Sequence, residues 1–243
     1  MNASTTPHIQ TQSHESSSTH QSVRIKEKSP KTAQLMKTKM RGWIHAGTAP
    51  LALANAIVLV CLAPSARLKW ACAVYLACGL ILFGVSATYH LGKWKPAVLR
   101  ALKRMDHSNI FLLIAGTYTP LSVALLDRGT CTLVLCIVWI GALAGIIMQV
   151  AWITAPRVLS VACYVLLGWV AIWFLPEYWV AGGPAIVWLL IAGGICYTVG
   201  AVFYATKKPN PWPRYFGFHE FFHTGTVAGY ACHAVATWLA VMA

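Results

Sequence analysis

Long apolar runs separated by short polar gaps make up most of the chain after residue 42. A helix needs about 20 mostly apolar residues to cross the hydrocarbon core of a bilayer. The gaps contain Pro, Gly or charged residues, which end helices and favour turns. The pattern predicts an all-α membrane protein, built as a bundle of seven transmembrane helices. The predicted spans cover approximately residues 43–62, 70–90, 107–126, 130–151, 158–175, 184–205 and 218–241.

The first 42 residues differ from the rest of the chain. They are rich in Ser, Thr, Gln, His and Lys and show no regular apolar spacing. Such a segment cannot bury enough apolar surface to fold, so we predict a disordered basic tail. The first apolar run begins about 40 residues into the chain, which is too late for the apolar part of a cleavable signal peptide. We therefore divide the chain into a tail, residues 1–42, and a seven-helix domain, residues 43–243.

The overall composition favours lipid as the main solvent of the domain. Hydrophobic residues make up 58% of the chain and charged residues only 10%, whereas soluble domains contain about 25% charged residues. The 19 Lys and Arg residues lie in the tail and in the gaps, and no basic groove is interleaved with aromatic residues. We therefore expect membrane lipid as a partner and no nucleic acid. A net charge of +13 favours contact with anionic lipid at the membrane surface.

The distribution of the basic residues predicts the orientation of the bundle. If the N-terminus is inside, the cytoplasmic segments carry 16 Lys and Arg residues and the outside segments carry 3. Cytoplasmic loops of membrane proteins are enriched in Lys and Arg. The sequence therefore predicts a multi-pass protein of the cell membrane with its N-terminus in the cytoplasm.

Polar clusters occur at three span ends, where their cost in a membrane makes them candidates for function. They are residues 86–90 (Ser-Ala-Thr-Tyr-His), 106–109 (Asp-His-Ser-Asn) and 219–223 (His-Glu-Phe-Phe-His). The end of span two and the starts of spans three and seven lie on one membrane face in either orientation. The topology therefore allows the three clusters to meet, and the charge bias places them at the cytoplasmic face.

The histidines of these clusters have the spacing of a metal site. His219 and His223 are four residues apart, so a helix presents both on one face. Two imidazoles in that relation can chelate one metal ion, and His90 on another helix would supply a third nitrogen. Three histidines with one position open to water form a catalytic zinc site. The sequence therefore predicts Zn²⁺ bound by His90, His219 and His223.

Two further polar residues are candidates for catalysis. Asp106 is predicted at a helix N-terminus, where the helix dipole favours a carboxylate. From there it would accept a hydrogen bond from metal-bound water, and Ser86 would do the same or hold a ligand. The alternative is a helix cap for Asp106 and an interfacial histidine for His90. The other span histidines are interpreted as interfacial or packed side chains: His45, His107 and His233.

Residues 219–223 also match the HExxH motif of zinc proteases, in which the Glu is the general base. An intramembrane protease of this type needs a further acidic ligand on a later segment. No Asp or Glu follows Glu220. We therefore disfavour a protease and interpret Glu220 as a helix cap or an interfacial charge.

Several of these motifs resemble those of the hemolysin III family, which belongs with the progestin and adipoQ receptors and, more distantly, the alkaline ceramidases. The resemblance covers roughly residues 41–243. It implies seven helices with an intracellular N-terminus, zinc held by His90, His219 and His223, and Ser86 and Asp106 beside the metal. The stretches that carry it are residues 86–90, 105–110, 114–120 and 218–223.

Two classes of function remain open from the sequence. The first is a zinc-dependent lipid hydrolase, acting on an amide or ester bond of a lipid substrate at the cytoplasmic face. The second is a non-enzymatic protein, receptor-like or cytolytic as a haemolysin, in which zinc joins spans two and seven. A transporter is less favoured, because no charged residue outside the clusters is predicted in the middle of a span.

Overall fold

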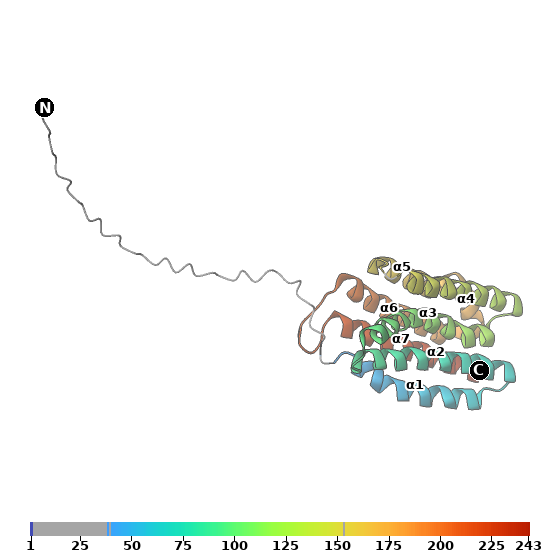
Figure 1. The fold of residues 1–243 in the computed structure, drawn as a ribbon. Coiled ribbons are helices and arrows are strands. Elements are labelled where there is room, and N and C mark those ends of the chain that lie inside the picture. Colours follow the sequence, from blue (N-terminus) through green and yellow to red (C-terminus); the bar gives the residue numbers. More distant parts are fainter. Residues whose placement is uncertain (2–37, 39, 153) are drawn as a thin grey trace. The chain divides into compact units, whose positions relative to one another are not determined.

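The computed structural model describes residues 1, 38, 40–152 and 154–243. Residues 36–243 form one compact unit, and the predicted disorder of residues 1–42 concerns mainly residues outside the described ones. Figure 1 shows the helices of the compact unit running side by side, with α1 at one edge and α5 at the opposite edge. The elements are α1 (Trp43–Leu62), α2 (Ala66–Leu91), α3 (Pro96–Leu125), α4 (Arg128–Ala151), α5 (Arg157–Gly168), the 3₁₀ helix η1 (Trp169–Phe174), α6 (Leu175–Thr206) and α7 (Phe218–Met242).

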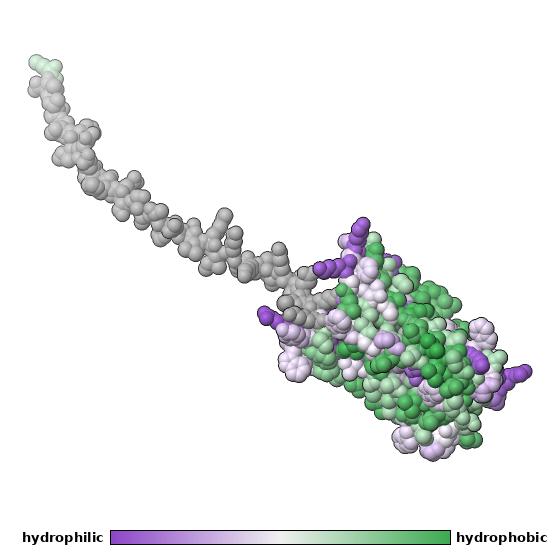
Figure 2. Space-filling view, turned by 90° about the horizontal axis from the view of Figure 1, so that it is seen from below, coloured by the Kyte–Doolittle hydropathy of each residue, from purple (hydrophilic) through white to green (hydrophobic). Residues whose placement is uncertain are grey.

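The expected all-helical membrane architecture is confirmed. Within the described residues, six helical stretches are long and apolar enough to cross a bilayer. Large apolar side chains are exposed on their outer faces, for example Leu51, Ile140 and Val180, which are 71%, 68% and 86% exposed. On the face of the bundle that Figure 2 draws, hydrophobic residues cover much of the middle, and the most hydrophilic residues lie toward the two ends. This surface suits a hydrocarbon solvent better than water.

The fifth of these stretches, Arg157–Thr206, is 50 residues long and contains α5, η1 and α6. Its helical geometry is interrupted at Gly183, where φ is 76° and ψ is 176°. A positive φ of this kind suits glycine, which has no Cβ to clash. The Arg157 Nη1 atom donates to the Tyr204 carbonyl at 3.2 Å, and the Trp169 indole donates to Thr198 Oγ1 at 2.9 Å. These contacts show that the stretch folds back on itself.

The start of α3 corrects one expectation from the sequence. Asp106 does not lie at a helix N-terminus, because α3 begins ten residues earlier, at Pro96. Proline is well suited to the first turn, since its fixed φ is helical and its missing N–H would have no helical partner. The basic turns that follow continue the helix beyond its apolar part. Asp106 therefore occupies the third turn, where the dipole of the helix end has little effect.

Close contacts of small residues bring α3 against its neighbours. A Cβ atom built on Gly116 of α3 would lie 2.6 Å from Cys78 Cβ of α2. A Cβ atom on Gly145 of α4 would lie 2.3 Å from the Phe111 ring of α3. Small residues of this kind let membrane helices approach closely. They fix α3 between α2 and α4, which holds Asp106 at the end of the bundle where α2 ends and α7 begins.

Candidate metal centre

Three histidines from two helices meet at one end of the bundle. His90 lies in the last turn of α2, and His219 and His223 lie in the first two turns of α7. One nitrogen from each ring lies within 4.8 Å of the other two. The Nε2 atoms of His90 and His219 are 3.2 Å apart. His90 and His223 are buried, at 5% and 1% exposure.

These distances fit a shared metal ion. Zinc binds histidine nitrogens at about 2.0–2.1 Å in tetrahedral geometry, which places neighbouring nitrogens about 3.3 Å apart. The separation of 3.2 Å between His90 and His219 matches this value, and the third ring needs only a small approach. The buried His223 Nδ1 atom has no hydrogen-bond partner among the described residues. Three neutral imidazoles with an unsatisfied nitrogen are a donor set suited to Zn²⁺.

The carboxylate and the hydroxyl predicted beside the metal lie next to the histidines. Asp106 Oδ2 is 3.7 Å from His90 Nε2, and the Asp106 side chain is 10% exposed. Ser86 lies one helical turn before His90 on α2 and is 1% exposed. Its hydroxyl is beside the Asp106 carboxylate, although Ser86 Oγ makes no hydrogen bond of standard geometry with a described residue. Both groups therefore face the centre with bonding capacity to spare.

His45 of α1, interpreted from the sequence as an interfacial or packed histidine, lies within the same site. Its ring stacks on the His223 ring, with centroids 3.9 Å apart and planes at 11°. The His45 ring also packs edge to face with the Phe83 ring, with centroids 5.2 Å apart. His45 is 3% exposed, and neither of its ring nitrogens has a hydrogen-bond partner among the described residues. A fourth imidazole therefore contacts the candidate ligands directly.

Tyr204 near the end of α6 also faces the centre and was not predicted. Its hydroxyl is 3.4 Å from His107 Nε2, and its ring packs against the His219 ring at a centroid distance of 5.8 Å. The Arg157 guanidinium lies over the Tyr204 ring, 4.5 Å from its centroid, in the geometry of a cation–π contact. Through Tyr204, α6 contacts the centre, and Tyr204 also contacts His107 of α3 and Arg157 of α5.

The side chains around the centre line a small cavity, which we call the histidine cavity. It holds about 400 Å³ of empty space, its open side included. Residues of α1, α2, α3, α5, α6 and α7 contribute to its wall, and many of them are polar. They include His45, Ser86, Asp106, His107, Tyr204, His219 and His223.

Comparisons with known proteins identify the family of this chain. The family model described as "Haemolysin-III related" matches residues 33–234. The chain belongs to the haemolysin-III-related family. It is 39% identical over 114 residues to "Hemolysin-3" of Bacillus cereus, and 36% identical over 131 residues to "Hemolysin-3 homolog" of Bacillus subtilis (strain 168). These alignments cover 46% and 54% of this chain, and 52% and 61% of the two relatives.

The chain therefore spans between half and two thirds of the length of these haemolysin relatives. Family membership and the apolar helices together identify a multi-pass integral membrane protein of the cell membrane. The family model covers all five of the residues predicted at the centre: Ser86, His90, Asp106, His219 and His223.

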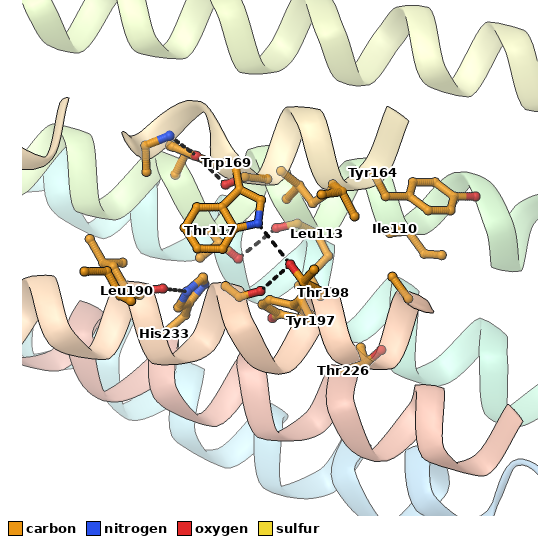
Figure 3. A pocket seen from close by; sticks show the side chains of 18 of the residues that line it. Ile110, Leu113, Thr117, Tyr164, Trp169, Leu190, Tyr197, Thr198, Thr226 and His233 are labelled. Carbon is orange, nitrogen blue, oxygen red and sulfur yellow. Dashed lines mark hydrogen bonds between the residues drawn. The ribbon is translucent and has the colours of Figure 1, made fainter. Parts of the chain in front are cut away.

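In this haemolysin-III-related protein, a second and larger cavity adjoins the first. This apolar cavity holds about 1050 Å³ of empty space, its open side included, and most of its wall is aliphatic or aromatic. Figure 3 shows Tyr164, Ile110 and Thr226 at one end of it and His233 and Leu190 at the other. Five residues line both cavities, which makes them neighbours: Leu82, Ile110, Tyr164, Phe222 and Thr226.

His233 belongs to the wall of the apolar cavity rather than to the centre. Its Nε2 atom is 3.1 Å from the Leu190 carbonyl, and its ring packs against Tyr197. It is a packed histidine, as the sequence indicates.

Glu220, the acidic residue of the HExxH string, is fully buried and serves the helix end. Its Oε2 atom accepts a hydrogen bond from the Gly217 N–H at 2.8 Å, so its side chain caps the start of α7. Its Oε1 atom accepts from the Thr38 hydroxyl and lies 3.5 Å from Arg41 Nε. The carboxylate is thus saturated by donors of the backbone and of the segment before α1. This supports the interpretation of Glu220 as a cap rather than a base.

Proposed function

We propose that this haemolysin-III-related protein is a zinc-dependent hydrolase of lipid amide or ester bonds. The observation that carries the proposal is the meeting of three imidazoles with a buried carboxylate, 3.7 Å from His90 Nε2. A metal ion with an adjacent general base is a common arrangement in hydrolases. The large apolar cavity next to the centre supports a lipid rather than a water-soluble substrate.

The donors assign a role to each residue. His90, His219 and His223 would hold the zinc, which supplies a polarised carbonyl and a water of lowered pKa. Asp106 takes the proton of the attacking water, whose oxygen bonds to the carbonyl carbon. Ser86 donates a hydrogen bond to the carbonyl oxygen as negative charge develops there.

The proton held by Asp106 is used in the second half of the reaction, which forms the products. When the bond from the carbonyl carbon to the leaving oxygen or nitrogen breaks, the leaving group takes the proton held by Asp106. A fatty acid and an alcohol or amine result, and no other reactant is needed. During this reaction the acyl chain would occupy the apolar cavity, whose wall is formed mainly by α3, η1 and α6.

We propose further that the chain crosses the membrane seven times, with the N-terminus in the cytoplasm. The stretch Arg157–Thr206 would measure about 75 Å as one helix, far more than the ~30 Å hydrocarbon core. Its reversal at Gly183 favours two crossings. The excess of Lys and Arg at the end that bears the histidine cavity favours a cytoplasmic position for that end. A phosphatase reporter fused to the C-terminus is then expected to be active outside the cell.

Hydrolysis of a defined lipid tests the proposed activity. Purified protein in nanodiscs would receive lipids with a labelled acyl chain, and release of the labelled fatty acid would be measured with zinc and with a chelator. We expect release only with zinc, and none from the His90→Ala variant. Full release by a variant that has lost zinc would contradict a catalytic role of the metal.

The names of the two relatives support a second candidate function, that of a cytolytic protein, because both carry the name hemolysin. In this alternative, the zinc joins α2 to α7 in a membrane-perturbing protein without chemistry. The discriminating assay measures erythrocyte lysis and released fatty acid in the same sample. Lysis without fatty acid release would favour the alternative.

A further inference from the structure

Arg41, in the segment that enters α1, has a guanidinium group fixed beside the candidate metal centre. Its Nε atom lies 3.5 Å from the buried Glu220 carboxylate, and its side chain is 17% exposed. The same carboxylate oxygen accepts the Thr38 hydroxyl. Among the described residues, no hydrogen bond engages the two terminal amino groups of Arg41. They are the groups with which arginine binds carboxylates and phosphates in a bidentate manner.

The backbone around Arg41 is held against both helices that carry the histidines. The next residue, Gly42, has a φ of 94°, and a Cβ atom there would lie only 2.7 Å from His90 Cβ. Three residues later, His45 stacks on His223. The charge of Arg41 acts on the His219 and His223 rings. The guanidinium therefore lies near the histidine cavity without lining it, on the side that we call the cavity mouth.

The charges around this mouth favour an anion. The positive charges of Lys103 and Arg157 lie close enough to His107 to interact with its ring. The only carboxylates among the described residues at this end are Asp106 and Glu220, and both are turned inward, Asp106 to His90 and Glu220 to its donors. A mouth with several cations and no exposed carboxylate attracts negative charge. A ligand that places a negative charge at this mouth and also fills the apolar cavity is an anionic lipid.

We propose that the substrate is a glycerophospholipid and that Arg41, held by Glu220, binds its phosphate. In such a lipid the phosphate is only a few bonds from the acyl ester. With the ester carbonyl at the histidines, the phosphate reaches the cavity mouth and the acyl chain lies in the apolar cavity. Water adds to the ester carbonyl, the ester C–O bond breaks, and a lysophospholipid leaves with the proton. This inference rests on the proposed hydrolase function and narrows its substrate.

A comparison of two lipids with identical acyl chains tests the inference. The zinc-loaded full chain in nanodiscs would hydrolyse phosphatidylglycerol or diacylglycerol, and kcat/KM would be measured for each. We expect Arg41→Gln to reduce the preference for the phospholipid at least about tenfold, the value of one charge-assisted hydrogen bond, mainly through KM. Arg41→Lys should restore part of it. The matched control is Arg100→Gln, an exposed arginine of α3 outside the cavity, which should leave the preference unchanged.

Three further outcomes are decisive. An unchanged preference in Arg41→Gln with normal zinc content would overturn the inference and leave the hydrolase proposal standing. Inorganic phosphate at millimolar concentration should not inhibit, and competitive inhibition would show that the site takes free phosphate instead. If the wild type hydrolyses neither lipid, the proposed hydrolysis of ester bonds fails. Equilibrium binding of phosphatidylglycerol to wild type and Arg41→Gln then still tests the phosphate site, with weaker binding expected for the variant.

Discussion

The imidazole of His45 lies flat on that of His223, with ring centroids 3.9 Å apart and planes at 11°. The two residues are 178 positions apart in the chain and belong to α1 and α7. Stacking of this kind restricts rotation of the His223 ring about its side-chain bonds. In metal sites, the residues behind a ligand set its orientation and much of its affinity. We therefore regard His45 as the residue that positions His223 for metal binding.

Replacing His45 separates the effect of its ring from that of its nitrogens. We expect His45→Ala to weaken zinc binding about tenfold, within the range for residues behind a metal ligand. His45→Phe should retain most of the affinity, because a phenyl ring can still stack on His223. The measurement is a zinc competition titration with a chromophoric chelator. Equal affinity in His45→Ala and wild type would show that the stack has no influence on the metal.

Removing the charge of Asp106 should separate catalysis from metal binding. We expect Asp106→Asn to retain its zinc, because the three ligand nitrogens are intact, and to lose at least about a hundredfold in lipid hydrolysis. Metal content and fatty acid release would be measured on the same preparation. Ser86→Ala provides the comparison and should lose less. Near-normal turnover in Asp106→Asn would contradict its role as the base.

The backbone at Gly42 should tolerate no side chain. Its φ of 94° strains any other residue, and an added Cβ atom would lie 2.7 Å from His90 Cβ. Backbone strain of this type costs about 1–3 kcal/mol, so we expect Gly42→Ala to lower Tm and to weaken zinc retention by displacing His90. The control is Gly84→Ala in α2, where a Cβ atom would meet nothing within 4 Å. It should leave Tm unchanged or raise it, and an equal loss in both variants would contradict the argument.

The N-cap of α4 should lose its contribution in acid. The Thr130 side chain and the N–H groups of Thr130 and Gly129 hold the pKa of Asp127 below its ordinary value of 3.8. Because the folded state depresses this pKa, the contribution is present above the unfolded value of about 3.9 and disappears as the pH falls through the folded value. The Tm difference between wild type and Asp127→Ala should be constant near neutral pH and shrink below about pH 4.

The uncharged cap Asp127→Asn is the control for this pH dependence. Asparagine also caps helices but does not titrate. Its Tm difference from Asp127→Ala should therefore persist in acid. A wild-type difference that stays constant in acid would contradict the prediction.

The sequence predicts the helices well because apolar runs of about 20 residues have few other structural outcomes. Its error at Asp106 has a physical cause. A helix may continue beyond its apolar part, and hydropathy does not detect the polar turns that Pro96 begins. The start of α3 was visible only as the Lys95-Pro96 pair, which also fits a turn.

The site was predictable as far as its residues share an obvious spacing. His219 and His223 show the spacing of one helix face, and span counting placed His90 and Asp106 on the same side. The same counting also places the start of α1 and the end of α6 there, and could have included His45 and Tyr204. Neither has a motif, since ring stacking and a tyrosine–histidine contact arise from packing between distant segments.

Metal analysis of the purified protein tests the central claim most directly. Wild type and His219→Ala would be purified in parallel without added zinc, and their metal content would be measured by mass spectrometry. Circular dichroism would establish that both remain folded. The account predicts about one zinc ion per wild-type chain and almost none in the variant. A folded wild type that binds no zinc when zinc is supplied, or a variant that retains the wild-type amount, would contradict it.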